Sequence, residues 1–192
     1  MLIHIIGPGA SGKSTLGAAL ADKINFDFID LDYEYPENEI NSDIQDRGYE
    51  YYVYRNIENY LNLKLTNCNT VLATSSGFMT YDSTIHPEIK TIHESILSEK
   101  TTILVLPSFD REVCISEITK RQMERVFNSN SRSEHRQKII ERFNIYRNMG
   151  HVKVATDKPI NMVLRCIISE LQLLTSSCTG QNTRCVRILP VS

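Results

Sequence analysis

The sequence predicts a three-layer α/β fold in which helices flank a parallel sheet of five strands. Short apolar runs alternate with amphipathic helical patterns along the chain, which is typical of successive βαβ units. A glycine-rich loop joins the first apolar run to the first helical pattern, as in phosphate-binding α/β domains. The length of 192 residues suits one well-buried domain and is too short for two ordinary ones.

Five short runs of aliphatic and β-branched residues are the predicted strands. In chain order they are Leu2–Ile6, Phe26–Asp30, Thr70–Thr74, Thr102–Leu106 and Val152–Ala155. A helical pattern separates each run from the next, and such connections join parallel strands. We therefore expect a doubly wound sheet whose strands all end at the same edge.

Six segments with helical periodicity follow these strands. The first places Leu16, Leu20 and Ile24 on one face. The six segments are Lys13–Ile24, about Asn41 to Leu65, Glu88–Ser98, Glu112–Phe127, Ser133–Asn148 and Pro159–Leu174.

One domain is expected over residues 1–174. Within it, the polar run Asn128–Arg132 lies between two helical patterns, which fits a short lid near residues 125–132 and fits a plain helix–helix loop equally well. The segment 175–192 is rich in Ser, Thr, Cys and Gly, and we expect a peripheral or disordered tail.

Composition excludes several classes of protein. A net charge of −2 argues against nucleic acid as a partner, because binding to phosphate backbones needs a basic face. No run is apolar enough for a membrane span, and the first residues resemble a strand rather than a signal peptide. The five cysteines lack C-x-x-C spacing, so Cys114 and Cys166 are interpreted as core thiols. We expect a monomer in the cytoplasm.

The segment Gly7–Ser14 matches G-x-x-x-x-G-K-[ST] between a predicted strand and a predicted helix. Its glycines let backbone N–H groups turn toward phosphates, and the helix N-terminus adds a positive dipole end. In such loops the lysine, here Lys13, reaches the β- and γ-phosphates, and the Ser14 hydroxyl ligates Mg²⁺. The predicted nucleotide-binding residues are Gly9, Ala10, Ser11, Gly12, Lys13, Ser14 and Thr15.

Two carboxylates follow the second predicted strand. Asp30 and Asp32 fall on the same side of an extended segment, at the strand end where open α/β sheets bind ligands. One carboxylate can serve the Mg²⁺ shell while the other binds the hydroxyl that is phosphorylated. A solvated acidic strand end is the alternative interpretation.

Two later arginines are also candidate binding residues. Arg55 and Glu58 are i, i+3 neighbours on a predicted helix, so Glu58 could orient the guanidinium, although a surface pair would show the same spacing. Arg142 is close to the end of another helix, where a solvated cation stabilised by the helix dipole is the alternative. Between them, the strand from Val71 runs into the turn Ser75-Ser76-Gly77.

The order of these motifs resembles the shikimate kinase family, whose P-loop is followed by D-x-D, F-R-x-x-E, a strand ending in G-G-G, a lid with arginines, R-x-x-L-Y and an adenine-side loop. In this chain the order is Gly7–Ser14, Asp30 and Asp32, Tyr54–Glu58, Ser75–Gly77, Arg121 and Arg125, Arg142–Tyr146, and Thr156–Pro159. The resemblance covers about residues 2–174. It implies a P-loop kinase fold with strand order 2-3-1-4-5, ATP and Mg²⁺ as cofactors, and a small anionic acceptor such as shikimate.

The resemblance also implies roles for single residues. Ser14 and Asp30 hold Mg²⁺, and Asp32 contacts the acceptor hydroxyl as a catalytic residue beside Lys13. Arg125 swings in with the lid toward the transferring phosphate. The remaining assignments are Arg55 and Arg142 at the acceptor carboxylate, Gly77 against the acceptor ring, and Arg121 with Pro159 at adenine. A charged helix face is the alternative for Arg121 and Arg125.

Two departures from the family pattern concern the acceptor. Ser75 and Ser76 replace glycines where backbone approaches the ring, and they could hydrogen-bond an acceptor or crowd it. Arg125 is followed by Val126-Phe127 rather than by the P-L-L of the family lid. Kinases of a gluconate-like acid, a nucleoside or an antibiotic hydroxyl, and a nucleotide-binding protein without turnover, therefore stay as alternatives.

Overall fold

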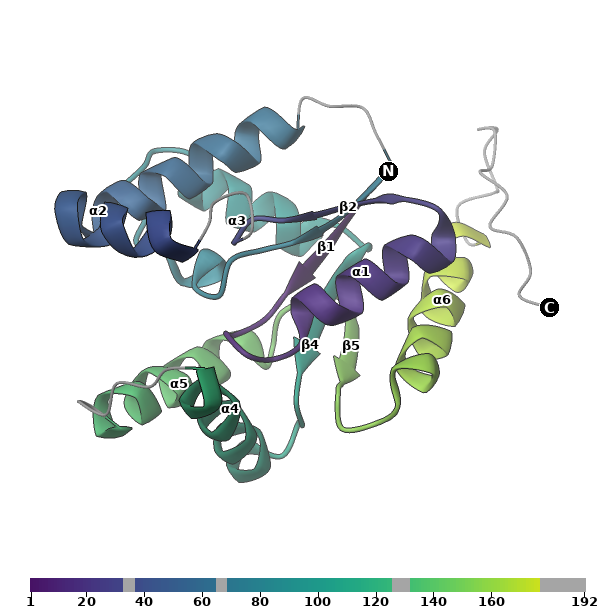
Figure 1. Ribbon diagram of the computed structural model, residues 1–192. Coiled ribbons are helices and arrows are strands. Elements are labelled where there is room, and N and C mark those ends of the chain that lie inside the picture. Colours follow the sequence, from purple (N-terminus) through teal and green to yellow (C-terminus); the bar gives the residue numbers. More distant parts are fainter. Residues whose placement is uncertain (33–36, 65–68, 126–131, 177–192) are drawn as a thin grey trace.

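The five predicted strands form one parallel sheet in the order β2-β3-β1-β4-β5, which confirms the expected topology (Figure 1). The strands are β1 (Leu2–Ile6), β2 (Asp27–Asp30), β3 (Thr70–Ala73), β4 (Thr102–Leu106) and β5 (Val152–Ala155). The computed structural model describes residues 1–32, 37–64, 69–125 and 132–176, with side chains omitted at 37–46, 125, 132–135 and 173–176.

In the described part of the chain, six helices cover the two faces of the sheet. They are α1 (Lys13–Ile24), α2 (Glu37–Lys64), α3 (Ile89–Ser98), α4 (Arg111–Arg125), α5 (Arg132–Tyr146) and α6 (Ile160–Ser176). The helices α1 and α6 pack on one face, and α2 to α5 pack on the other (Figure 1). Successive side chains of the central strand β1 point to opposite faces of the sheet and so enter two different cores. Ile3 and Ile5 face α1, whereas Ile6 faces α2. The predicted three layers are present.

The structure adds two local features to the predicted elements. The helix α2 begins at Glu37, ahead of the expected Asn41, and Gly48 interrupts it with φ 84° and ψ 166°. A short 3₁₀ turn, η1 (Phe78–Thr80), follows the serine-rich turn and buries Phe78 and Met79. Gly48 directly precedes Tyr49, and Gly77 directly precedes η1.

The predicted lid and tail fall mostly outside the described residues. Of the expected lid, the backbone at residues 125 and 132 is described, where α4 ends and α5 begins. Of the expected tail, Thr175 and Ser176 continue α6, and residues 177–192 lie outside the described part of the chain.

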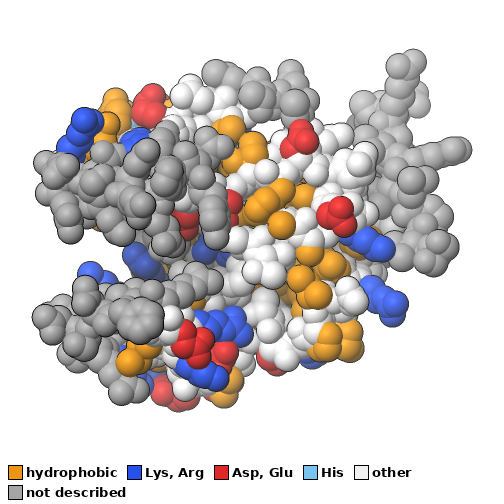
Figure 2. Space-filling model, viewed as in Figure 1, with side chains coloured by type: hydrophobic (Ala, Val, Ile, Leu, Met, Phe, Trp, Pro, Cys, Tyr) orange, Lys and Arg blue, Asp and Glu red, His pale blue; other side chains and the backbone are white. Residues whose placement is uncertain are grey.

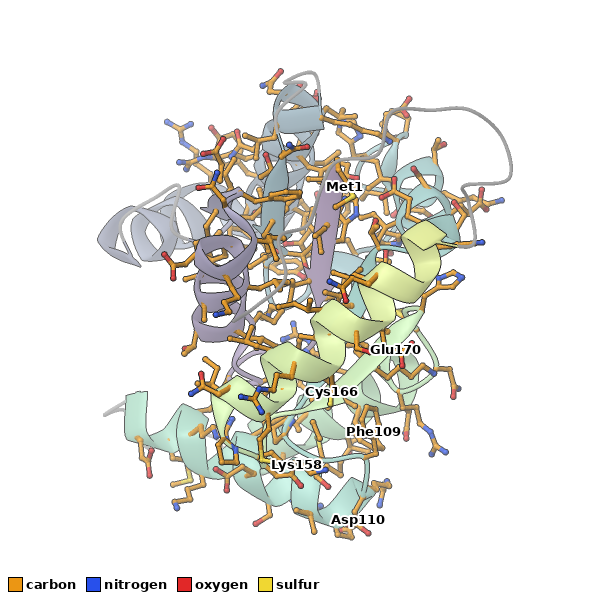
Figure 3. The ribbon with its side chains drawn as sticks, turned by 90° about the vertical axis from the view of Figure 1, so that its right-hand side faces the viewer. Met1, Phe109, Asp110, Lys158, Cys166 and Glu170 are labelled. Carbon is orange, nitrogen blue, oxygen red and sulfur yellow. The ribbon has the colours of Figure 1, made fainter. Side chains whose placement is uncertain are left out.

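The amino ends and the carboxyl ends of the parallel strands lie at opposite ends of the molecule. Figure 3 shows Met1 at one end, whereas Asp110 and Lys158, which follow β4 and β5, lie at the other.

The same view shows Cys166 on α6, where its side chain is exposed rather than in the core as predicted, while Cys114 is buried as expected. The helical periodicity in the sequence did not show that Cys166 lies on the outer, exposed face of α6. None of the described helices combines the length and apolar composition that a bilayer span requires.

A buried polar contact ties the central strand to the end of α3. His4 is fully buried on β1, with Nε2 3.0 Å from the Tyr60 hydroxyl and Nδ1 3.0 Å from Glu99 Oε2. The hydrogen bond with His4 lowers the pKa of Glu99, against the effect of partial burial. A carboxyl whose pKa is lower in the folded state stabilises the fold above its unfolded pKa, and this contribution disappears as the pH falls through the folded pKa.

We therefore predict that Glu99→Ala lowers the free energy of unfolding at pH 7 by about 1 kcal/mol, because it leaves a buried ring nitrogen without its partner. The deficit relative to wild type should shrink as the pH falls below the ordinary pKa of a glutamate carboxyl and through the lower pKa of folded Glu99. Urea unfolding at pH 7 and over a series of acidic pH values measures this. Glu94→Ala, on the exposed face of α3, is the control, and a deficit independent of pH would contradict the prediction.

Candidate active site

The glycine-rich loop between β1 and α1 has the backbone of a phosphate cradle. Ala10 and Gly12 adopt left-handed conformations, with φ 60° and φ 100°. The carbonyls of Ala10 and Ser11 accept hydrogen bonds from Arg121 Nη1 (3.3 Å) and Thr156 Oγ1 (3.0 Å). These contacts fix the loop from outside, so that its N–H groups and the N-terminus of α1 are available to an anion.

Lys13, Ser14 and Thr15 form the first turn of α1. The Lys13 side chain is buried and folds back over the loop, and its Nζ donates to the Pro8 carbonyl at 3.0 Å. Ser14 is half-buried and Thr15 is exposed. A buried ammonium above a cradle of N–H groups suits the terminal phosphates of a nucleotide.

Asp30 has one carboxylate oxygen bound and one available. It ends β2 and is 6% exposed, and its Oδ1 accepts from the Asp32 backbone N–H at 3.0 Å. Its Oδ2 is buried and has no hydrogen-bond partner among the described residues, and the same is true of Ser11 Oγ. Because a buried polar atom without a partner costs free energy, Oδ2 fits a site completed by a cation or by water bound to one.

Asp32 lies between the phosphate loop and the serine-rich turn. Burial raises the pKa of this carboxyl, and the charge of Asp30 acts in the same direction, while Lys13 lowers the pKa. Two further hydrogen bonds hold the carboxylate, one from the Ser76 backbone and one from the Tyr52 hydroxyl at 3.3 Å. The group is therefore fixed at the edge of the phosphate site, with an opposite charge beside it.

The turn after β3 brings Gly77 against Arg142. A Cβ atom at Gly77 would lie 3.1 Å from Arg142 Nη2, 3.3 Å from the Tyr81 ring and 3.6 Å from the Tyr49 hydroxyl. Arg142 Nη1 also lies 3.5 Å from Ser76 Oγ. A side chain at position 77 would thus fill the space in front of the guanidinium.

The two serines of this turn point to different surroundings. Ser75 is fully buried, and its hydroxyl hydrogen-bonds the Tyr81 hydroxyl at 2.6 Å, so it does not crowd the turn. Ser76 faces the site: a Cβ atom at Gly9 would lie 3.3 Å from its Cβ, and its carbonyl accepts from the Tyr146 hydroxyl at 3.4 Å. Ser76 therefore connects the phosphate loop with Arg142.

The remaining predicted residues lie around this centre. Arg121 pairs with Glu117 at 2.8 Å in addition to its contact with the loop. Pro159 is exposed at the start of α6, where its carbonyl accepts from Met162 N. Arg125 ends α4, but its side chain lies outside the described part of the structure. The predicted contacts of Arg121 and Pro159 with an adenine thus stay predictions.

Arg55 and its predicted partner lie on α2. The Arg55 side chain is half-buried, and Glu58 Oε1 is 2.9 Å from His86 Nε2, in the segment before α3. The i, i+3 spacing of Arg55 and Glu58 gave no sign of this contact with a residue 28 positions away.

Three tyrosines contact one another at the site. Tyr49 and Tyr52 lie one helical turn apart on α2, and their ring centroids are 6.1 Å apart. Tyr49 also contacts the Tyr81 ring edge-on at 6.5 Å. Their i, i+3 spacing, continued by Arg55, was the available signal that this face of α2 meets the site.

Figure 2 shows Lys and Arg side chains between the half that carries α2 and the half that carries α4 and α5. The phosphate loop follows β1, Asp32 follows β2, and Arg142 on α5 lies beside Gly77 after β3. The carboxyl ends of the strands are where open α/β sheets bind ligands.

Comparisons with known proteins agree with this arrangement. A model of the shikimate kinase family matches residues 9–172. A shikimate kinase of Francisella tularensis subsp. novicida is 30% identical over 160 residues, which cover 81% of this chain and 85% of that protein.

Solved structures show the same fold. Shikimate kinase from Aquifex aeolicus matches with a TM-score of 0.66 and 23% identity, covering 94% of this chain and 100% of that one. A gluconokinase from Sinorhizobium meliloti matches with a TM-score of 0.57 and 18% identity, covering 91% and 93%. Because kinases named for different acceptors share this fold, the acceptor must be argued from the site.

Proposed function

This chain belongs to the shikimate kinase family, and on that premise we propose that it transfers the γ-phosphate of ATP to a hydroxyl group of shikimate. The observation that carries the proposal is the position of Asp32. Its carboxylate contacts the Ser76 backbone, beside Arg142, and lies within the electrostatic reach of Lys13. One acidic side chain thus stands between a phosphate cradle and an arginine suited to a carboxylate.

The phosphate side of the site would bind and orient ATP. Backbone N–H groups of residues 9–14 and the Lys13 ammonium would surround the β- and γ-phosphates. Ser14 and Asp30 would hold Mg²⁺ directly or through water, which agrees with the unpartnered Oδ2 of Asp30. When bound, the ion neutralises charge on the phosphate oxygens. Arg121 and Pro159 would flank the adenine, and Arg125 would approach the transferring phosphate.

The acceptor side would bind a carboxylate and a hydroxyl at once. Arg142, with Arg55 from α2, would bind the carboxylate through the planar guanidinium fork. Because glycine has no side chain, the acceptor ring would lie directly against the backbone at Gly77, in front of Arg142. Asp32 would accept the proton of the acceptor hydroxyl. The oxygen of that hydroxyl would form a bond to the γ-phosphorus of ATP while the bond between the γ-phosphorus and the ADP oxygen breaks.

An assay of ADP release by the purified protein, with ATP and Mg²⁺, tests the proposal. We expect release to depend on shikimate and to exceed the rate with ATP alone by at least about tenfold, because the positioned acceptor outcompetes water. Equal rates with and without shikimate would contradict the proposed acceptor.

A second acceptor class is favoured by one observation, the Ser76 hydroxyl within 3.5 Å of Arg142. This hydroxyl could bind a polar group of a different hydroxy acid, so gluconate is the comparison substrate in the same assay. ADP release that depends on gluconate but not on shikimate would support this second class.

Arg142→Lys is the variant that tests the carboxylate contact. Lysine keeps the charge but loses the bidentate fork, so the acceptor KM should rise about tenfold while the KM for ATP stays unchanged. Steady-state kinetics with each substrate varied in turn measure both constants. An unchanged acceptor KM would point to a neutral acceptor.

A further inference from the structure

The hydroxyl of Tyr52 stands between Asp32 and a buried pair of hydroxyl groups. It donates to Asp32 Oδ1 at 3.3 Å. Behind it, the hydroxyls of Ser75 and Tyr81 hydrogen-bond each other at 2.6 Å, and both lie close enough to the Tyr52 hydroxyl to lower its pKa. Ser75 is fully buried and Tyr81 is 5% exposed. These three hydroxyls come from α2, from the turn after β3 and from the residue after η1.

The chemistry of these groups gives the hydrogen bonds a direction. An ionised carboxylate only accepts, so Tyr52 must donate its proton to Asp32 and can only accept from Ser75 or Tyr81. Of those two, one donates to the other, which leaves the proton of the second available to Tyr52. The hydroxyls can therefore form a chain of donors that ends at Asp32. Burial and the Asp32 charge raise the pKa of Tyr52 to about 12, so this donor keeps its proton at neutral pH.

The Tyr52 side chain is also fixed at its backbone and its ring. The Asn56 amide Nδ2 donates to the Tyr52 carbonyl at 2.9 Å, one turn further along α2. The ring contacts Tyr49, which faces Gly77. A donor held by a buried network has little freedom to turn away from its acceptor.

We propose that Tyr52 is a positioning residue for the transfer reaction. Its hydroxyl, backed by Ser75 and Tyr81, holds one oxygen of Asp32, so that the other oxygen is presented to the hydroxyl that is phosphorylated. This inference rests on the proposed function, in which Asp32 binds the acceptor hydroxyl. Small errors in the orientation of a reacting group are costly in rate, so a fixed carboxylate favours transfer.

The first test compares two tyrosines on α2. Tyr52→Phe removes the hydroxyl and keeps the ring, and we expect kcat of the folded variant to fall about tenfold with the KM for ATP unchanged. Tyr51→Phe makes the same change at an exposed side chain that pairs with Arg47, and its kcat should stay within about twofold of wild type. Equal kcat in Tyr52→Phe and wild type would overturn the inference.

A second variant covers the case in which Tyr52→Phe does not fold. Tyr81→Phe removes a hydroxyl behind Tyr52, and it should lower kcat in the same direction by a smaller factor, with the KM for ATP unchanged. A folded Tyr81→Phe protein with wild-type kcat would count against the hydrogen-bonded chain.

A double-variant comparison separates positioning from packing. If Tyr52 acts through Asp32, then Tyr52→Phe should have no further effect on kcat in an Asp32→Ala background. The same tenfold loss in both backgrounds would show that Tyr52 acts independently of Asp32, and the inference would fail.

A spectroscopic measurement keeps the inference distinct from the proposed function. With ¹³Cγ-labelled aspartate, the Asp32 signal, assigned by its loss in Asp32→Ala, should shift in Tyr52→Phe but not in Tyr51→Phe at the same pH. If the wild-type protein does not turn over shikimate, the proposed acceptor is wrong. The Asp32 signal would still decide whether Tyr52 holds Asp32. An unchanged signal in Tyr52→Phe would overturn the inference in either case.

Discussion

Replacing Lys13 by alanine should lower kcat by at least about two orders of magnitude and leave the stability of the fold nearly unchanged. The ammonium is buried over the phosphate loop, where its Nζ donates to the Pro8 carbonyl. In that position it would stabilise charge on the transferring phosphate, and losing one such group costs about 100- to 1000-fold in rate. Its removal also relieves the cost of burying a charge, which offsets the lost hydrogen bond.

The measurement is kcat from ADP release together with the free energy of unfolding in urea. Lys23→Ala is the matched control, because Lys23 lies exposed in the last turn of the same helix, and its loss should cost a few tenths of a kcal/mol and no activity. A Lys13→Ala enzyme with near-normal kcat would refute a role for Lys13 in the chemistry.

The sheet could be predicted from sequence because its signals are local. Each strand is a short run of buried aliphatic residues, and β1, β4 and β5 have the predicted bounds. The phosphate loop was equally accessible, since its spacing, its preceding strand and its following helix are contiguous in the chain. Two strands are one residue shorter than predicted, because the signal at their ends was weaker. Phe26 lies outside β2, and Thr74 lies outside β3.

The acceptor side was less predictable because its contacts join distant segments. Asp32 and Tyr52 are 20 residues apart, and Ser76 and Arg142 are 66 apart. Helical spacing identified which residues share a face of α2, but the packing of α2 on the sheet decides what that face meets. For the same reason, the contact of Glu58 with His86, 28 residues away, could not be inferred from helical spacing.

Asp32→Asn should be the most severe change on the acceptor side, with kcat lowered by about 100-fold or more. Asparagine has the size of aspartate and can still accept the hydrogen bond from Tyr52, so the position of the side chain is kept. It cannot take the proton of the attacking hydroxyl, and general-base catalysis of this kind contributes about 10²- to 10⁴-fold. ATP binding should not weaken, because the variant removes a negative charge beside the phosphate site.

Asp27→Asn is the control for this change, since Asp27 is exposed at the start of the same strand. Calorimetric titration with ATP and steady-state kinetics with shikimate separate the two effects in each variant. If Asp32 is the base, then Asp32→Asn retains ATP affinity and loses kcat, whereas a carboxylate needed only for metal binding would lose both together. A kcat within about threefold of wild type would remove Asp32 from the chemistry, because no general base of ordinary efficiency contributes so little.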